Sequence, residues 1–272
     1  MEQRHTQPSA VPHGLHGRRS ESCSCNTETT QMNAKLQIGT FIKTRSPHVV
    51  EVIGTTGLDF GVIDAEHAPF DRASLDIMLL AGRAAQLPLF VRIPEINAAV
   101  VLSCLDLGAA GLLVPHVDSA EQAREVVAMA RYRNGIRGYS GGPRAGGYAT
   151  LPMKEVLDRG DATQVICQIE SPSGVAAAHE IAAQDGVAGL FIGRADLALA
   201  MGLTDSRAPE VLAATQGVLA AANAAGKWAG MHVANNAERE QFMSQGANWF
   251  VVSSDQTLLR NAVQSIARPA GQ

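Results

Sequence analysis

Eight short apolar runs alternate with amphipathic stretches along this chain, and no other feature constrains its fold as strongly. Continuous apolar runs are typical of parallel strands with both faces covered, and amphipathic stretches are typical of the helices that cover them. The runs lie near residues 36–42, 58–64, 87–93, 111–117, 164–170, 187–193, 227–233 and 248–254. The amphipathic stretches lie near residues 47–56, 72–85, 97–107, 119–131, 173–184, 208–225, 236–245 and 256–267. Eight such units predict an α/β fold, a (β/α)8 TIM barrel, rather than an open doubly wound sheet.

The composition fits one large barrel that acts on small molecules. The chain has 272 residues, of which 46% are hydrophobic and 4% aromatic, so we expect a core made mainly of Ala, Val, Leu and Ile. The formal net charge is −4, with no broad basic field. We therefore expect neither a nucleic acid nor a membrane as partner.

The first 31 residues differ in composition from the rest. They are rich in Ser, Thr, Gln, His, Arg and Pro and nearly lack large hydrophobic side chains, which predicts a disordered leader. Residues 32–272 form the predicted barrel domain. Met32 runs straight into the first strand, so it is an alternative start of the protein.

Cysteine usage and hydropathy predict a cytoplasmic location. Cys23 and Cys25 lie in the leader, and Cys104 and Cys167 lie inside apolar elements, without the spacing of a disulfide framework. No apolar run approaches the roughly 20 residues of a membrane span, and the leader lacks the apolar region of a signal peptide.

The segment 132–150 interrupts the regular alternation. It is rich in Gly, Arg and Tyr and is too long for a routine connection. We expect it to form a lid or a binding loop over the active face of the barrel, where it would help to bind the substrate.

Two strands are each followed by a carboxylate. Glu170 ends the run 164–170, and Asp196 follows the run that ends at Gly193. The carboxyl ends of barrel strands meet on one face, so two acids there suggest a divalent metal site. Alternatively, each acid caps the helix that follows it.

Two other strand ends carry residues suited to acid–base and anion chemistry. Asp64, Glu66 and His67 follow one strand, and an Asp beside a His can fix its tautomer and raise its basicity. Arg92 is the only charge in its apolar run and requires an anion, either a carboxylate such as Glu66 or a substrate oxygen. Independent helix caps do not account for a His, an Arg and two acids at different strand ends.

These residues lie in motifs that resemble the HpcH/HpaI family of metal-dependent pyruvate aldolases. The resemblance runs from about Gly39 to Asn261. The motifs are Asp64-x-Glu-His67, Val91-Arg-Ile-Pro94, Gln168-x-Glu170, Gly193-x-Ala-Asp-Leu197, Gly135-Ile-Arg-Gly138 with Arg144-Ala145, and Ser254-Asp-Gln-Thr-Leu258. Their occurrence together and in this order is specific.

The resemblance implies a metal site. Glu170 and Asp196 would bind Mg²⁺, Mn²⁺ or Co²⁺, ions that accept oxygen ligands at near-octahedral geometry. Gln168 would hydrogen-bond beside the ion, and the main-chain N–H groups of Ala195 and Asp196 would hold the pyruvate carboxylate.

The resemblance also implies the catalytic groups. Arg92 would bind the 2-oxo oxygen, where negative charge builds as an enolate forms. His67, oriented by Asp64, would be the general base. Phe41 occupies a position where the family often has an aromatic residue near the substrate, and a role in the core is an equal alternative.

Two departures from the family pattern affect the surroundings of the site. Arg194 replaces a proline, where it is either solvated beside the site or an added cation for an acidic substrate. His116 stands where an apolar residue is common, as a hydrogen-bonded residue at the barrel mouth or as a catalytic group. His232 has the same two interpretations.

We therefore expect a class II aldolase that cleaves a 4-hydroxy-2-oxo acid reversibly to pyruvate and an aldehyde. No lysine ends the sixth strand, which favours metal over imine chemistry. The alternatives are a carbon–carbon lyase or synthase acting on a CoA thioester or citrate-like acid, and a non-catalytic barrel that binds a 2-oxo acid. By resemblance we expect a homo-oligomer, such as a hexamer, in which helix 256–267 is exchanged. The sequence leaves the aldehyde undetermined.

Overall fold

The computed structural model describes residues 35–267, and these form a closed barrel of eight parallel strands. The strands pair in sequence order, and β8 closes the barrel on β1. They are β1 (Gln37–Ile42), β2 (Phe60–Asp64), β3 (Leu89–Arg92), β4 (Gly111–Val114), β5 (Gln164–Ile169), β6 (Val187–Ile192), β7 (Trp228–Val233) and β8 (Trp249–Ser254). The predicted (β/α)8 fold is confirmed. The predicted disordered leader, with Cys23 and Cys25, lies outside the described residues.

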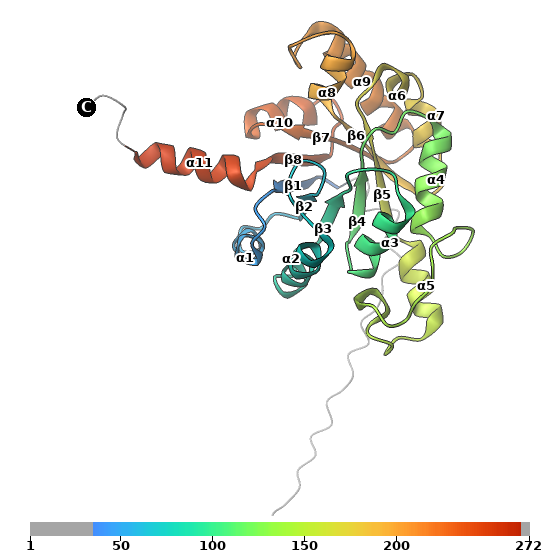
Figure 1. Ribbon diagram of the computed structural model, residues 1–272. Helices are drawn as coiled ribbons and strands as arrows, with labels where there is room; N and C mark the ends of the chain where they lie inside the picture. The colour runs from blue at the N-terminus through green and yellow to red at the C-terminus, as the bar shows by residue number, and fades with distance from the viewer. Residues whose placement is uncertain (1–34, 268–272) are drawn as a thin grey trace, which may run out of the picture.

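Helices surround the barrel, with the exception of α11, which projects away from it (Figure 1). The helices are α1 (Pro47–Gly54), α2 (Arg72–Ala84), α3 (Ala98–Asp106), α4 (Ala120–Ala130), α5 (Met153–Asp161), α6 (Pro172–Ala176), α7 (Ala178–Ala182), α8 (Arg194–Ala200), α9 (Pro209–Ala224), α10 (Asn236–Met243) and α11 (Asp255–Ile266). In the described chain, no helix combines the length and apolar character that a membrane crossing needs.

The helices differ from the sequence prediction in three places. The predicted helix 173–184 is two short helices, α6 and α7, that meet at Ala177. Helix α5 was not predicted, because it is mostly polar and buries only Val156 and Gly160. Helix α8 was also missed, because its seven residues follow β6 directly without a polar break.

The interior of the barrel is more aromatic than the composition suggests. Its residues are Phe41, Phe60, Val62, Phe90, Leu113, Ile166, Phe191, Trp228, Trp249 and Val251. The rings of Phe60 and Trp249 stack with centroids 4.2 Å apart. A Cβ at Gly39 would overlap the ring of Phe60, so this strand position requires glycine. The few aromatic residues fill the barrel, whereas aliphatic residues form most of the layer between strands and helices.

The segment 132–150 lies at the amino-terminal end of the barrel, so its prediction as a loop over the active face was wrong. Arg144 donates to the carbonyl of Leu107, which precedes β4, at 2.5 Å. Tyr148 lines a cavity with Pro88, which precedes β3. The segment follows α4, and a helix returns the chain to the amino ends of the strands. Within one chain it is therefore remote from the carboxyl-terminal face.

Candidate active site

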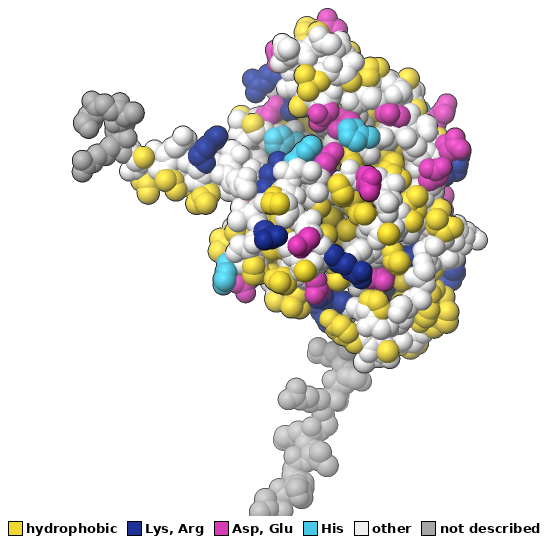
Figure 2. Space-filling model, in the orientation of Figure 1, with side chains coloured by type: hydrophobic (Ala, Val, Ile, Leu, Met, Phe, Trp, Pro, Cys, Tyr) yellow, Lys and Arg dark blue, Asp and Glu magenta, His cyan; other side chains and the backbone are white. Residues whose placement is uncertain are grey.

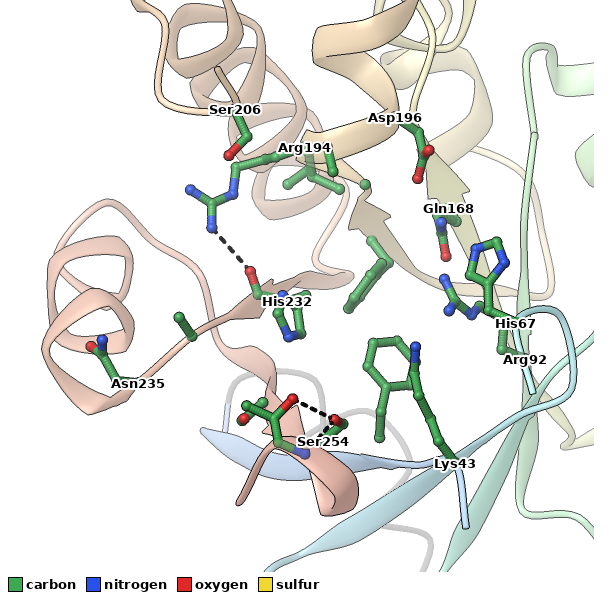
Figure 3. A pocket seen from close by; sticks show the side chains of 18 of the residues that line it. Lys43, His67, Arg92, Gln168, Arg194, Asp196, Ser206, His232, Asn235 and Ser254 are labelled. Carbon is green, nitrogen blue, oxygen red and sulfur yellow. Dashed lines mark hydrogen bonds between the residues drawn. The ribbon is translucent and has the colours of Figure 1, made fainter. Parts of the chain in front are cut away.

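A cavity of about 620 Å³ opens at the carboxyl ends of the strands. It is bordered by strand ends and by the residues that follow them, as expected for the functional face of a barrel. Its lining residues are Phe41, Lys43, His67, Arg92, Gln168, Phe191, Ile192, Gly193, Arg194, Ala195, Asp196, Ser206, His232, Ala234, Asn235, Ser253, Ser254, Thr257 and Asn261. Asp196, Gln168, His67 and Arg92 lie on one side, and Arg194, Ser206 and Asn235 lie on the other (Figure 3).

The two predicted metal ligands differ in exposure. Glu170 follows β5 directly and is buried, with 4% of its surface exposed. Asp196 lies in the first turn of α8 and is exposed in the cavity, beside Ala195. Gly193 lies against Glu170, because a Cβ at this position would come within 2.6 Å of Oε2 of Glu170. Glycine at this position therefore leaves room for the carboxylate.

Gln168 connects the buried carboxylate to the cavity. Its Nε2 donates to Oε2 of Glu170, and its Oε1 is buried with no hydrogen-bond partner among the described residues. Within residues 35–267, neither Lys nor Arg pairs with Glu170. A buried carboxylate without a cation is costly, and an unpaired amide oxygen nearby is a further ligand for a hard cation.

This donor set fits a divalent cation that is completed by groups from outside the protein. In the described chain, no three His, Cys, Asp or Glu side chains lie close enough to hold an ion by themselves. Two carboxylates and an amide oxygen supply oxygen donors only, as Mg²⁺ and Mn²⁺ prefer. Water and substrate oxygens would have to complete the coordination.

Arg92 is held by two carboxylates at the edge of the cavity. Its Nε and Nη2 donate to Oδ1 and Oδ2 of Asp64 at 2.9 and 2.8 Å, and its Nη1 lies 3.2 Å from Oε2 of Glu66. Burial raises the pKa of Asp64, but the hydrogen bonds from Arg92 and Lys43 outweigh it, so this pKa lies below its ordinary value. Arg92 therefore contacts structural carboxylates and also faces the cavity.

The structure corrects the expected role of Asp64. The carboxylate accepts the main-chain N–H of His67 at 3.1 Å, and its other contacts are to Arg92 and Lys43. The imidazole of His67 instead lies near Glu66, with Nε2 3.6 Å from Oε2. Asp64 thus positions the loop and Arg92, and Glu66 is the acid beside the His67 ring.

The carboxylate of Glu66 lies near three other residues of the site, His67, Arg92 and His116. Burial raises its pKa above the ordinary value, and the negative charge of Glu170 adds to this increase. Its Oε1 lies 3.5 Å from Nε2 of His116, whose Nδ1 lies 3.0 Å from Oε1 of Glu170. His116 therefore lies between two acids at the barrel mouth. The Pro115-His116 departure was the sequence signal for it.

Arg194 is buried and paired, not solvated. Its Nη2 donates to Oε1 of Glu238 at 2.7 Å and to the main-chain carbonyl of His232 at 3.1 Å. The guanidinium also lies over the ring of Phe242, 4.6 Å from its centroid. These contacts tie the start of α8 to β7 and α10.

Opposite Asp196, Gln168 and His67, the cavity is lined by Arg194, whose charge is paired with Glu238, and by neutral hydrogen-bonding groups (Figure 3). The neutral groups are Ser206, His232, Asn235, Ser253, Ser254, Thr257 and Asn261. Desolvation within the cavity, followed by the nearby positive charge of Arg194, lowers the pKa of His232 to about 4, so its ring is neutral. Besides His232, Ser254 and Thr257 stand in a motif that the sequence analysis singled out. The other four were missed, since they lie in loops, near the end of β8 or on α11, where no periodic pattern marks them.

Lys43 and Phe41 come from the end of β1. Lys43 was missed, although a lysine directly after an apolar strand is a visible signal, and its Nζ lies 3.0 Å from Oδ2 of Asp64. Phe41 belongs to the barrel core and also lines the cavity. The guanidinium of Arg92 lies 4.6 Å from the centroid of its ring. Lys227 directly precedes β7, at the opposite end of the barrel, where its Nζ donates to the carbonyl of Val187.

Comparisons with known proteins agree with this geometry. The sequence profile of the family described as HpcH/HpaI aldolase/citrate lyase matches residues 37–262. A 5-keto-4-deoxy-D-glucarate aldolase of Klebsiella pneumoniae is 37% identical over 235 residues, which cover 86% of this chain and 91% of the relative.

Solved structures show the same architecture. An HpcH/HpaI aldolase/citrate lyase family protein of Burkholderia cenocepacia superposes with a TM-score of 0.83 at 31% identity, covering 88% of this chain and 97% of that protein. The citrate synthase SbnG superposes with a TM-score of 0.78 at 26% identity, covering 88% of this chain and 94% of that protein.

Proposed function

This chain belongs to the HpcH/HpaI aldolase/citrate lyase family, and on this basis we propose that it is a class II, metal-dependent pyruvate aldolase. The reaction is cleavage of a 4-hydroxy-2-oxo acid to pyruvate and an aldehyde, and the reverse condensation. One observation carries the proposal: a buried carboxylate without a Lys or Arg partner, Glu170, lies in the described structure beside a cavity that contains Asp196, Arg92 and His67.

Glu170, Asp196 and Oε1 of Gln168 are the donors proposed for Mg²⁺, Mn²⁺ or Co²⁺. The ion would supply positive charge next to the 1-carboxylate and 2-oxo oxygens of the substrate. The main-chain N–H groups of Ala195 and Asp196, in the first turn of α8 beside the cavity, are the proposed donors to the same carboxylate.

Arg92 is suited to stabilise the enolate that forms when the C3–C4 bond breaks. A guanidinium has five N–H donors, and two of them are used by Asp64. Because Asp64 and Glu66 fix the guanidinium from two sides, its remaining donors are held in place before the substrate binds. Such preorganised donors stabilise developing charge without reorganisation.

His67 is the proposed general base. About half of its side chain is exposed, and it lines the cavity close to Arg92. The imidazole would take the proton of the 4-hydroxyl while the C3–C4 electron pair moves into the enolate. The aldehyde then leaves, and C3 of the enolate takes up a proton to give pyruvate.

The remaining half of the cavity supports an aldehyde that carries hydroxyl groups. Its neutral donors and acceptors, such as Ser206, Asn235 and Asn261, match hydroxyls better than they match an alkyl chain. Relatives are named for a deoxy sugar diacid. We therefore propose a 2-oxo-3-deoxy or 5-oxo-4-deoxy sugar acid as the class of substrate.

A pyruvate-release assay tests the proposed function. The panel should contain 4-hydroxy-2-oxo acids with hydroxylated, carboxylated and simple alkyl ends, each with and without Mg²⁺ or Mn²⁺. We expect metal-dependent pyruvate release that is fastest with hydroxylated substrates. Cleavage of citrate without pyruvate release from any panel member would instead support the lyase or synthase alternative, which the citrate synthase neighbour represents.

Helix α11 supports the proposed homo-oligomer. It leaves the barrel wall and shows hydrophobic side chains along one side (Figure 2). Leu259, Val263 and Ile266 are 66%, 52% and 84% exposed. A groove of about 340 Å³ lies beside it, between residues 57–59 and α10. We propose that α11 of a second copy packs against this part of the barrel. The double variant L259K/V263K should therefore have a lower molar mass in solution than the wild type, as measured by light scattering.

A further inference from the structure

His116 has an unusual main-chain conformation next to the buried carboxylate of Glu170. Its φ is 55°, in the left-handed region that β-carbon-bearing residues seldom adopt. In this conformation its main-chain N–H donates to Oε1 of Glu170 at 2.8 Å. The side chain lies near the same oxygen, with Nδ1 at 3.0 Å. Main chain and side chain of one residue thus converge on one carboxylate oxygen.

The other carboxylate oxygen of Glu170 is also held. Oε2 accepts Nε2 of Gln168, and the open Cα of Gly193 lies beside it. An ionised carboxylate has about four acceptor positions. With two of them directed to His116 and one to Gln168, the remaining position is restricted in direction.

The far edge of the His116 ring lies near a second acid. Nε2 lies 3.5 Å from Oε1 of Glu66, whose other oxygen lies 3.2 Å from Nη1 of Arg92. A continuous set of contacts therefore runs around the barrel mouth from β2 and β3, through His116 after β4, to Glu170 after β5. Apart from these acids, the ring is exposed, with 67% of the side-chain surface accessible to solvent.

We propose that His116 is a positioning residue that orients the carboxylate of Glu170 for the divalent cation. A proton on Nδ1 places a donor 3.0 Å from Oε1 of Glu170, and Nε2 at the other edge of the ring lies 3.5 Å from Oε1 of Glu66. Groups that orient metal ligands in this way usually contribute 10- to 100-fold to metal affinity. The inference rests on the proposed function, since that function assigns the cation to Glu170.

Two substitutions at position 116 separate the side chain from the main-chain strain. Glycine adopts a positive φ without strain and keeps the N–H bond to Glu170, so H116G removes only the imidazole. Asparagine tolerates the left-handed region, and its amide nitrogen occupies roughly the place of Nδ1, so H116N retains a donor. Asn134 also has a φ of 55°, within the segment at the opposite end of the barrel, so N134G is a matched control.

The test is the Mn²⁺ dissociation constant, measured by calorimetry and by electron paramagnetic resonance of bound Mn²⁺, without substrate. We expect H116G to bind Mn²⁺ about 10- to 100-fold more weakly than the wild type. H116N should recover most of the affinity, and N134G should be unchanged. Circular dichroism and thermal unfolding of each variant check that it is folded.

The outcomes separate this inference from the proposed function. Wild-type affinity in folded H116G would overturn the positioning role while leaving the metal site intact, because it would show that only the main chain matters. If E170Q binds Mn²⁺ as the wild type does, the metal assignment itself fails, and the positioning role fails with it.

Discussion

The two ends of the barrel each contain a cavity and several arginines, yet only one end has the chemistry of an active site. The cavities measure about 620 Å³ at the carboxyl end and about 550 Å³ at the amino end. At the amino end, Arg137 pairs with Asp106 at 2.9 Å and Arg144 pairs with Asp76, so these two charges are matched locally.

At the carboxyl end, charges are shared and incompletely balanced. Arg92 lies between two acids, whereas Glu170, within the described residues, has no lysine or arginine partner. Cavity size and arginine content therefore do not identify the site. A buried carboxylate without a lysine or arginine partner does, because burying a negative charge is costly unless a positive charge accompanies it.

Removal of divalent ions should have the largest effect on activity, and we expect it to act only on the site at the carboxyl end of the barrel. We expect a chelator to abolish pyruvate release, and Mg²⁺, Mn²⁺ or Co²⁺ to restore it. E170A should be equally inactive but folded, since this side chain faces a site and supports little packing. Activity that persists in excess chelator contradicts the metal assignment, and an unfolded E170A would favour a purely structural carboxylate.

Replacing His67 should affect two reactions unequally. Aldol cleavage requires removal of the 4-hydroxyl proton, whereas decarboxylation of oxaloacetate reaches the pyruvate enolate without a base. We expect H67A to slow aldol cleavage by roughly 10²- to 10⁴-fold and to retain much of the decarboxylation. Equal losses in both would assign His67 to enolate binding and leave the base to be sought elsewhere, first at His116.

Arg92→Lys should slow both reactions by at least ~10²-fold in kcat, the usual scale for one preorganised donor. Lysine keeps the charge but loses the fork that binds both oxygens of Asp64. Steady-state kinetics with both substrates provide the measurement. A near wild-type rate would mean that Arg92 serves only its ion pairs.

Arg144→Ala tests an arginine at the amino end of the barrel, for comparison with the substitution of Arg92 at the carboxyl end. It removes a buried guanidinium that donates to the carbonyl of Leu107 and to Asp76, and the carbonyl loses a partner. We expect a loss of about 1–3 kcal/mol in the free energy of unfolding. In contrast to Arg92→Lys, kcat should change by less than about twofold, as urea unfolding and kinetics would show. A large loss in kcat would mean that the two ends are coupled.

The smallest predicted effect is on how the stability of the folded protein depends on pH, through His232 at the carboxyl end. Desolvation within the cavity and the positive charge of Arg194 lower the pKa of His232 to about 4 from an ordinary 6.5. Between these values the unfolded chain takes up a proton that the folded chain does not, so the folded state loses stability as the pH falls from 7 toward 4. H232N lacks this group, and its melting temperature should fall less than that of the wild type between pH 7 and pH 5. Parallel decreases would contradict the lowered pKa.

The sequence by itself determined the barrel and the convergence of its strand-end residues. Strand and helix periods are local properties, and all eight strands lie within about three residues of their predicted bounds. Once eight parallel strands close, residues at their carboxyl ends must meet. For this reason Arg92, Gln168 and Asp196 could be placed at one site before any distance was known.

Tertiary structure decided which partners these groups have. The pairing of Asp64 with Arg92, the burial of Arg194 against Glu238 and the contact of His116 with Glu170 each join different strands or helices. No local pattern encodes such contacts, because they depend on side-chain direction and on main-chain angles at strand ends. Tertiary structure also decided the position of residues 132–150, because α4 leads the chain back to the amino-terminal end of the barrel before this segment begins.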